Sequence, residues 1–159
     1  MDITNRLTEK FGSAILFTEE SDGMLAFTVQ AAAVIPMIQF LKESLNFNFL
    51  TDLCGIHYPD QTLPFGVIYH LHNFTANVRI RLKTFVSGPD PVIATATGLY
   101  PAANWMERET FDFYGIVFDG HPNLKRILNV DYLDYFPMRK EYPLEDPTRH
   151  DKDDQFFGR

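Results

Sequence analysis

Apolar residues recur every three or four positions in two stretches of the chain, which predicts helices there, and a third stretch also begins like a helix. They cover residues 2–11, 34–45 and 100–114. The first has Asp2 or Thr4 available as an N-cap. In the second, Pro36 suits the first turn, where no backbone N–H is needed.

Other stretches favour strands, because they are rich in β-branched and aromatic residues or alternate between apolar and polar side chains. The predicted strands are residues 13–18, 24–30, 47–57, 65–72, 78–83 and 92–97. The Asp22-Gly23 pair predicts a hairpin between the first two. The short connection after residue 72 predicts a second, antiparallel hairpin.

These elements indicate an α+β fold, a mixed or antiparallel β-sheet flanked by helices on one side. From Gly115 onward the pattern becomes irregular. Pro137, Pro143 and Pro147 and the alternating charges around them disfavour a packed element. We therefore expect a domain over residues 1–136 and an extended C-terminal arm over residues 137–159.

Composition narrows the class of protein. With 159 residues the chain is sized for one domain, and its net charge of -7 disfavours nucleic-acid binding. The first residues carry no pattern of a secretory or transit segment, and no apolar run is long enough for a bilayer. We expect a soluble, intracellular chain.

The single cysteine, Cys54, excludes internal disulfides and a self-contained iron-sulfur cluster. We expect it to be a small, buried apolar side chain.

The charged residues of the third predicted helix are candidates for acid/base chemistry. Glu107 and Glu109, however, point about 200° apart on a helix, so they cannot face one substrate. We expect them to form ion pairs and caps instead. Arg108 and Asp112 are four residues apart, which predicts an ion pair along the helix.

Other motifs lack part of the chemistry they would need. His70 and His72 share a strand face, but a zinc site needs further ligands, with only His57 and Cys54 nearby in sequence. The glycine spacing from Gly115 to Gly120 resembles a phosphate loop, yet His121-Pro122 replaces the required lysine and hydroxyl. No dinucleotide fingerprint or activated nucleophile is present.

Three basic residues, Arg79, Arg81 and Lys83, line one face of a predicted strand. We expect a solvated face, with a patch for an acidic partner as the alternative.

A longer pattern resembles a known family. Residues 107–128, with their Glu-Arg-Glu-Thr-Phe-Asp-Phe-Tyr-Gly-Ile and Gly-His-Pro-Asn-Leu runs, and residues 137–144 resemble the signature of the 30 kDa subunit of complex I, the proton-translocating NADH:quinone oxidoreductase. Residues 52–59, 69–71 and 79–83 resemble the strand core of that family. The resemblance covers residues 50–159.

This resemblance implies a structural subunit of the peripheral arm, without catalytic residues, on the cytoplasmic side of the inner membrane. Flavin, iron-sulfur clusters and quinone would be held by partner subunits. The chain would dock onto the quinone-pocket (49 kDa-type) subunit beside the terminal-cluster subunit. The family positions expected to serve as scaffold and docking residues are Glu107, Arg108, Glu109, Asp112, Gly115, Gly120, His121, Pro122, Arg126, Arg139 and Lys140.

Within that set, Arg108 and Asp112 would fix the following loop locally, whereas Arg139 and Lys140 would reach a neighbour. Three alternatives stay open. The chain could belong to a related membrane-bound hydrogenase or photosynthetic-type dehydrogenase. It could be a hydrolase using Glu107 or Asp112, or a monomeric binding module.

Overall fold

The computed structural model describes residues 2–21 and 23–142 of the chain. The helices of this part are α1 (Ile3–Phe11), α2 (Ala31–Leu45) and α3 (Ala103–Tyr114), with a 3₁₀ turn at Gly12–Ala14. The strands are β1 (Ile15–Ser21), β2 (Met24–Val29), β3 (Phe49–His57), β4 (Phe65–Asn73), β5 (Val78–Val86), β6 (Val92–Ala94) and β7 (Val117–Asp119).

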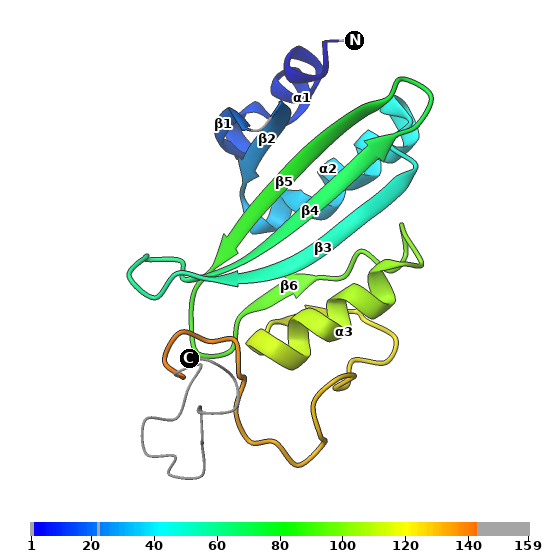
Figure 1. Cartoon of the computed structure of the whole chain (residues 1–159). Helices are drawn as coiled ribbons and strands as arrows, with labels where there is room; N and C mark the ends of the chain where they lie inside the picture. Colours follow the sequence, from blue (N-terminus) through cyan, green and yellow to red (C-terminus); the bar gives the residue numbers. More distant parts are fainter. Residues whose placement is uncertain (1, 22, 143–159) are drawn as a thin grey trace, which may run out of the picture.

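Five strands form a mixed sheet in the order β1-β2-β5-β4-β3 (Figure 1). The hairpins β1-β2 and β4-β5 are antiparallel, as predicted. After β2 the chain crosses the sheet through α2 to β3 at the far edge. It then returns through β4 and β5, so that β5 fills the position beside β2 and runs parallel to it. The predicted α+β class with a mixed sheet is confirmed.

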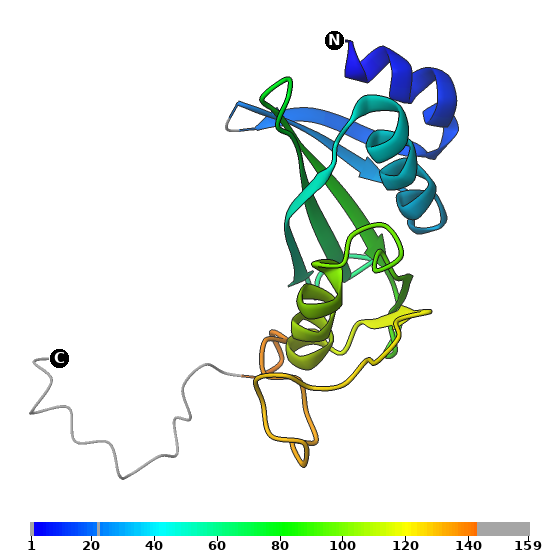
Figure 2. The same ribbon diagram turned by 90° about the vertical axis from the view of Figure 1, so that its right-hand side faces the viewer.

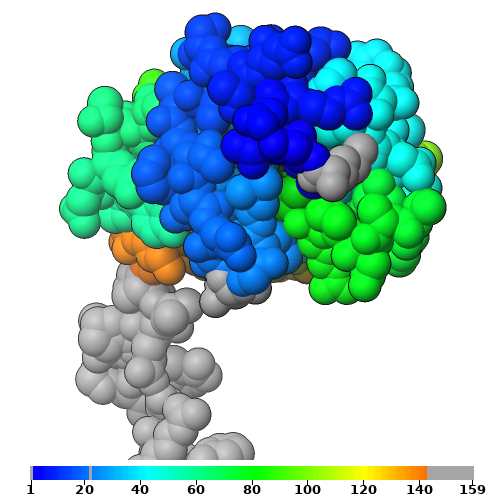
Figure 3. All heavy atoms as spheres, turned by 90° about the horizontal axis from the view of Figure 1, so that it is seen from above, coloured from blue at the N-terminus to red at the C-terminus, as the bar shows by residue number. Residues whose placement is uncertain are grey.

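The core lies between α2 and the sheet face that it covers. Apolar side chains of α2, including Met37 and Leu41, are fully buried, as are Phe27, Leu71 and Leu82 of the strands. Such burial is worth roughly 1.5–3 kcal/mol for each large side chain. In Figure 2, α1 and α2 lie on the same side of the sheet. Seen from above, α1 and the first two strands cover the middle of the molecule, with α2 beside them (Figure 3).

Strand β5 alternates as predicted. Ile80 and Leu82 are fully buried, whereas Arg79 is exposed. The other two basic residues of the strand are only partly solvated: Arg81 donates a hydrogen bond to Nε2 of His70 at 2.8 Å, and Lys83 pairs with Glu19 on β1.

Two expectations were wrong. Helix α2 begins at Ala31, so Pro36 lies in its second turn; three consecutive alanines, which favour helix strongly, extend it at its start. Residues after Gly115 are also not wholly irregular. Val117–Asp119 forms β7, which pairs in parallel with β6, a contact between segments more than 20 residues apart that local pattern does not reveal.

Helix α3 packs beside β3, at the edge of the sheet, and carries the first four candidate residues, whereas the others follow it in the chain (Figure 1). Gly55 of β3 permits the close approach, because a Cβ there would lie 2.6 Å from the Tyr114 ring. Among the helices described, none has the length and apolarity needed to cross a membrane.

Candidate docking surface around helix α3

Helix α3 is unusual because charged residues lie on its buried side. Glu107 and Asp112 are fully buried and Arg108 is 8% exposed, whereas Trp105 is 58% exposed. Buried charges need partners to offset their lost hydration. The partners of Arg108 and Asp112 come from the irregular segment that follows the helix, residues 125–142, which we call the C-terminal segment. Those of Glu107 precede the helix.

The carboxylate of Asp112 organises the start of this segment. Oδ2 accepts hydrogen bonds from the backbone N–H groups of Ile127, Leu128 and Asn129 at 3.0, 2.8 and 2.9 Å. Oδ1 accepts from Nη1 of Arg126 at 2.8 Å and from Nδ2 of the Asn129 side chain at 3.1 Å. Burial opposes ionisation, but these hydrogen bonds outweigh it and hold the pKa of Asp112 well below its usual range.

Arg126 extends the same network into residues 130–136. Its Nη2 donates to the carbonyls of Leu133 and Tyr135 at 2.8 and 3.0 Å, and its guanidinium lies 5.0 Å from the centre of the Phe136 ring. Five donors in a fixed fork allow one arginine to bridge several acceptors in this way. The irregular backbone is therefore held by a buried ion pair.

The predicted ion pair between Arg108 and Asp112 is wrong, because Asp112 pairs with Arg126 instead. Arg108 donates to the carbonyls of Lys125 and Arg126 at 3.1 and 3.0 Å and lies over the Trp105 ring. Both residues thus contact the loop after β7.

Arg139 also binds within the chain, although we expected it to reach a neighbour. Its Nε donates to the carbonyl of Tyr114 at 2.7 Å, and the guanidinium lies 4.7 Å from the ring centres of both Phe65 and Phe136. The backbone N–H of Lys140 donates to Nδ1 of His57 at 3.0 Å.

Residues 137–142 thus pack against the domain, which the sequence predicted to end at residue 136. The rest of the predicted arm, residues 143–159, lies outside the described residues.

The glycines and the histidine of the predicted set lie at turns of the backbone after α3. Gly115 ends α3 with a φ of 73°, and a Cβ there would lie 2.6 Å from both Arg139 and the Phe136 ring. Gly120 has a φ of 81°. His121, which precedes Pro122, accepts from the Asn123 N–H through Nδ1 at 3.0 Å. Its Nε2 lies 3.1 Å from the carbonyl oxygen of Asn104, so it can donate there.

The two glutamates of α3 occupy opposite environments. Glu107 accepts hydrogen bonds from the Thr95 hydroxyl and, at 2.6 Å, from the Ala96 N–H, so its predicted ion pair is wrong. Burial raises the pKa of Glu107 to about 7, despite these two donors. Glu109 is exposed. The two carboxylates do not form an acid/base pair.

Large apolar side chains project from the C-terminal segment into solvent. Those at least 36% exposed are Ile127, Leu128, Val130, Tyr132, Tyr135, Met138 and Tyr142. Tyr132 reaches 87%. Exposed apolar side chains gathered on a backbone held in place are typical of a protein-binding surface.

A second candidate, the histidine pair on β4, does not form a metal site in the described part of the chain. No group of three or more His, Cys, Asp and Glu side chains there is placed to hold a metal ion. Nε2 of His70 already accepts from Arg81, and His72 lies 3.4 Å from Asn77.

Comparison with known proteins agrees with the earlier resemblance. The family model described as the 30 kDa subunit of respiratory-chain NADH dehydrogenase matches residues 27–148. The chain belongs to this family. The family resemblance noted in the sequence is thereby confirmed.

Individual relatives are also subunits of NADH-quinone oxidoreductases. The chain is 38% identical to the C subunit of the enzyme from Geotalea uraniireducens, over 91% of this chain and 88% of the relative. It is 40% identical to the corresponding subunit of Geobacter sulfurreducens, over 91% and 90% of the two chains.

Solved structures share the fold of this chain. A trypsin-resistant fragment of Nqo5 matches with a TM-score of 0.68 and 30% identity, over 78% of this chain and all of the fragment. A chain of an archaeal membrane-bound sulfane sulfur reductase matches with a TM-score of 0.76 over 90% of this chain and 85% of that one. At 24% identity this second likeness concerns the fold alone.

Sequence reasoning missed several residues of this surface. Asn129 and Phe136, which complete the sites of Asp112 and Arg139, stand in no motif we recognised. Their roles depend on contacts between distant segments, for which neither spacing nor periodicity gives a signal.

Proposed function

We propose that this chain is a structural subunit of a proton-translocating NADH:quinone oxidoreductase, placed in the peripheral arm on the cytoplasmic side of the inner membrane. It has no catalytic residues and binds no flavin, cluster or quinone itself. It docks onto the quinone-pocket subunit beside the terminal-cluster subunit. The family membership and the relatives that are subunits of NADH-quinone oxidoreductases support the choice of complex.

The docking role is supported by the structure of the C-terminal segment. Its backbone is fixed by Asp112, Arg126 and Arg139, while its large apolar side chains face solvent. A surface already held in its binding conformation loses less entropy on association, so it binds more tightly for the same contacts. Aromatic and Met side chains, which this segment exposes, are enriched at the centres of interfaces.

Co-purification tests the proposal directly. The tagged chain is recovered from detergent-solubilised membranes of cells that carry it, and its companions are identified by mass spectrometry. We expect a flavin-containing NADH-oxidising subunit and the quinone-pocket subunit. Recovery with hydrogenase subunits would instead favour the related hydrogenase. Recovery of the chain alone, with membrane NADH:quinone oxidoreductase activity unchanged when its gene is deleted, would overturn the proposal.

Hydrogen exchange tests the docking surface in the same preparation. In the isolated chain we expect slow amides in residues 65–83. The amides of residues 125–142 should exchange more slowly in the assembly than in the isolated chain, because a partner then covers this segment. Absorption spectra of the isolated chain should lack flavin and cluster bands. Unchanged exchange of residues 125–142 on assembly would count against docking through this part of the chain.

A further inference from the structure

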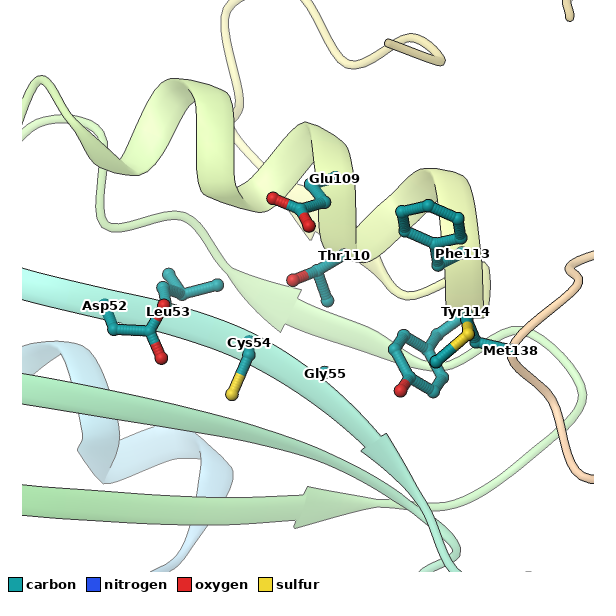
Figure 4. Close-up of a pocket in the computed structure, with 9 residues that line it drawn as sticks. All are labelled: Asp52, Leu53, Cys54, Gly55, Glu109, Thr110, Phe113, Tyr114 and Met138. Carbon is teal, nitrogen blue, oxygen red and sulfur yellow. The ribbon is translucent and has the colours of Figure 1, made fainter. Parts of the chain in front are cut away.

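A hollow of about 240 Å³ lies between β3 and α3. It is lined by Asp52, Leu53, Cys54, Gly55, Glu109, Thr110, Phe113, Tyr114 and Met138 (Figure 4). Met138 belongs to the C-terminal segment, so the hollow adjoins the surface proposed above for docking. Its volume exceeds the roughly 150 Å³ of a cavity that takes benzene, and falls below the roughly 300–1,000 Å³ of small-molecule sites. It therefore suits a single side chain.

The lining is acidic. Asp52 and Glu109 contribute carboxylates, and no basic side chain of the described residues lines the hollow. Glu109 is exposed and has no hydrogen bond or ion pair with the described residues. Oδ2 of Asp52 lies 3.4 Å from Nδ1 of His70. Burial and the neighbouring Arg81 lower the pKa of His70, so at pH 7 the imidazole is neutral and does not cancel the Asp52 charge.

The cysteine in the hollow responds to the same charges. Burial raises the pKa of the Cys54 thiol to about 11, and Asp52 and Glu109 add to this rise, against a smaller opposing effect of Arg81. Burial would disfavour a charge of either sign, so only the contribution of the two carboxylates bears on the sign of the potential. Their negative charge, which lies beside the thiol, attracts a cation.

The hollow is also divided along its length. In Figure 4 the carboxylates of Asp52 and Glu109 lie toward one end, whereas Phe113, Tyr114 and Met138 lie toward the other. Lysine and arginine have the same division, a charged head on an apolar stem. Arginine in addition packs its guanidinium plane against aromatic rings.

We propose that this hollow receives a basic side chain of the partner protein, with its cationic head toward Asp52 and Glu109 and its stem against Phe113, Tyr114 and Met138. This inference rests on the docking function proposed above. It identifies one specific contact within that function.

Cys54 is the only cysteine of the chain and reports on occupancy. N-Ethylmaleimide labelling of Cys54 is timed in the isolated chain and in the purified assembly, at the same pH. We expect labelling to slow at least ten-fold in the assembly. Equal rates would mean that the hollow stays open. That result overturns the inference while leaving the docking function intact, provided the chain still co-purifies with its complex.

Charge neutralisation tests the chemistry of the occupant. The double variant Asp52→Asn/Glu109→Gln is compared with a control of equal charge, Glu9→Gln/Glu20→Gln, whose side chains lie on α1 and β1, away from the hollow. Thermal unfolding establishes that both variants fold. We expect the first to bind its complex at least about ten-fold more weakly, since one side of a desolvated ion pair is lost, and the control to bind like the unmodified chain.

Binding of Asp52→Asn/Glu109→Gln equal to that of the control, with Cys54 still protected, would mean that the occupant is not cationic and would overturn the inference. Failure of the unmodified chain to co-purify with any membrane complex would instead contradict the proposed function itself. The two proposals therefore fail by different results.

Discussion

Oδ2 of Asp112 accepts a hydrogen bond from the backbone N–H of Leu128 at 2.8 Å, although the side chain of Leu128 is 65% exposed. A fully buried carboxylate on α3 thus fixes the backbone of a residue whose apolar side chain faces solvent. The buried charges of the helix thus hold the backbone from which the apolar side chains of the C-terminal segment project. Substitutions can test the buried charges and the exposed apolar groups separately.

Asp112→Ala should destabilise the isolated chain by about 3–5 kcal/mol, because it leaves Arg126 as an unpaired, largely buried cation. Chemical denaturation measures the loss, and hydrogen exchange should show faster amides at residues 127–129. The control is Asp131→Ala, an exposed aspartate in the same segment. A loss no larger than that of the control would show that the network does not hold the segment.

Glu107 should make stability fall as pH rises. Its pKa is about 7 in the folded chain against an ordinary value of 4.5, so between these values the unfolded chain has released a proton that the folded chain keeps. Stability from this group is complete below about pH 4.5 and decreases by roughly 3 kcal/mol as pH passes through 7.

Urea denaturation across this range, on the native chain and on Glu107→Gln, isolates the effect. The difference in unfolding free energy between the two chains should shrink as pH falls from 7 to 4.5. His57 and His70 have lowered pKa values and contribute the opposite slope, but equally in both chains. Asp112 does not interfere, since its lowered pKa affects stability only at more acidic pH. Parallel pH profiles would contradict the prediction.

Gly115→Ala should lower the free energy of unfolding by more than the backbone strain of a positive φ accounts for. A side chain in the left-handed region costs about 1–2 kcal/mol. At Gly115 the new Cβ would also lie 2.6 Å from Arg139 and the Phe136 ring, adding about 1–3 kcal/mol of overpacking. Gly23→Ala is the matched control, with a φ of 70° and no neighbour within 4 Å. Equal losses of unfolding free energy at the two positions would show that the C-terminal segment does not pack against Gly115.

Arg139→Ala should loosen the C-terminal segment in the isolated chain, because the guanidinium binds Tyr114 and stacks between two aromatic rings. Limited proteolysis should then cut residues 137–142 faster. Arg139→Lys should not restore protection, since lysine lacks the planar fork. Lys140→Ala, whose side chain is exposed, is the control. An unchanged cleavage rate together with weakened assembly would restore a direct role for Arg139 at a partner.

Leu128→Ser combined with Tyr132→Ser should weaken assembly about ten-fold or more, because apolar anchors dominate interfaces. It should change the unfolding free energy by less than about 0.5 kcal/mol, as is usual for exposed positions. Leu16→Ser, at an exposed leucine on β1, is the control. Assembly unaffected by the double substitution would place the docking surface elsewhere.

Local signals in the sequence were sufficient for much of the fold. Periodicity identified the first two helices, the Asp22-Gly23 turn identified the first hairpin and the short connection after residue 72 identified the second, because these features depend on neighbours close in the chain. The alternation of β5 correctly separated its buried from its polar face. The motif from Glu107 to Leu128 also led to the right family without any structural information.

The parallel pairs β2-β5 and β6-β7, the choice of Arg126 over Arg108 as partner of Asp112, and the hollow beside Cys54 were decided only by the tertiary structure. In each case the contacting groups come from segments separated along the chain. Helical spacing placed Arg108 within reach of Asp112, but the packing of residues 125–129 against α3 set a second arginine and three N–H groups at the same carboxylate. Sequence spacing defines which contacts are possible, and only the folded arrangement selects among them.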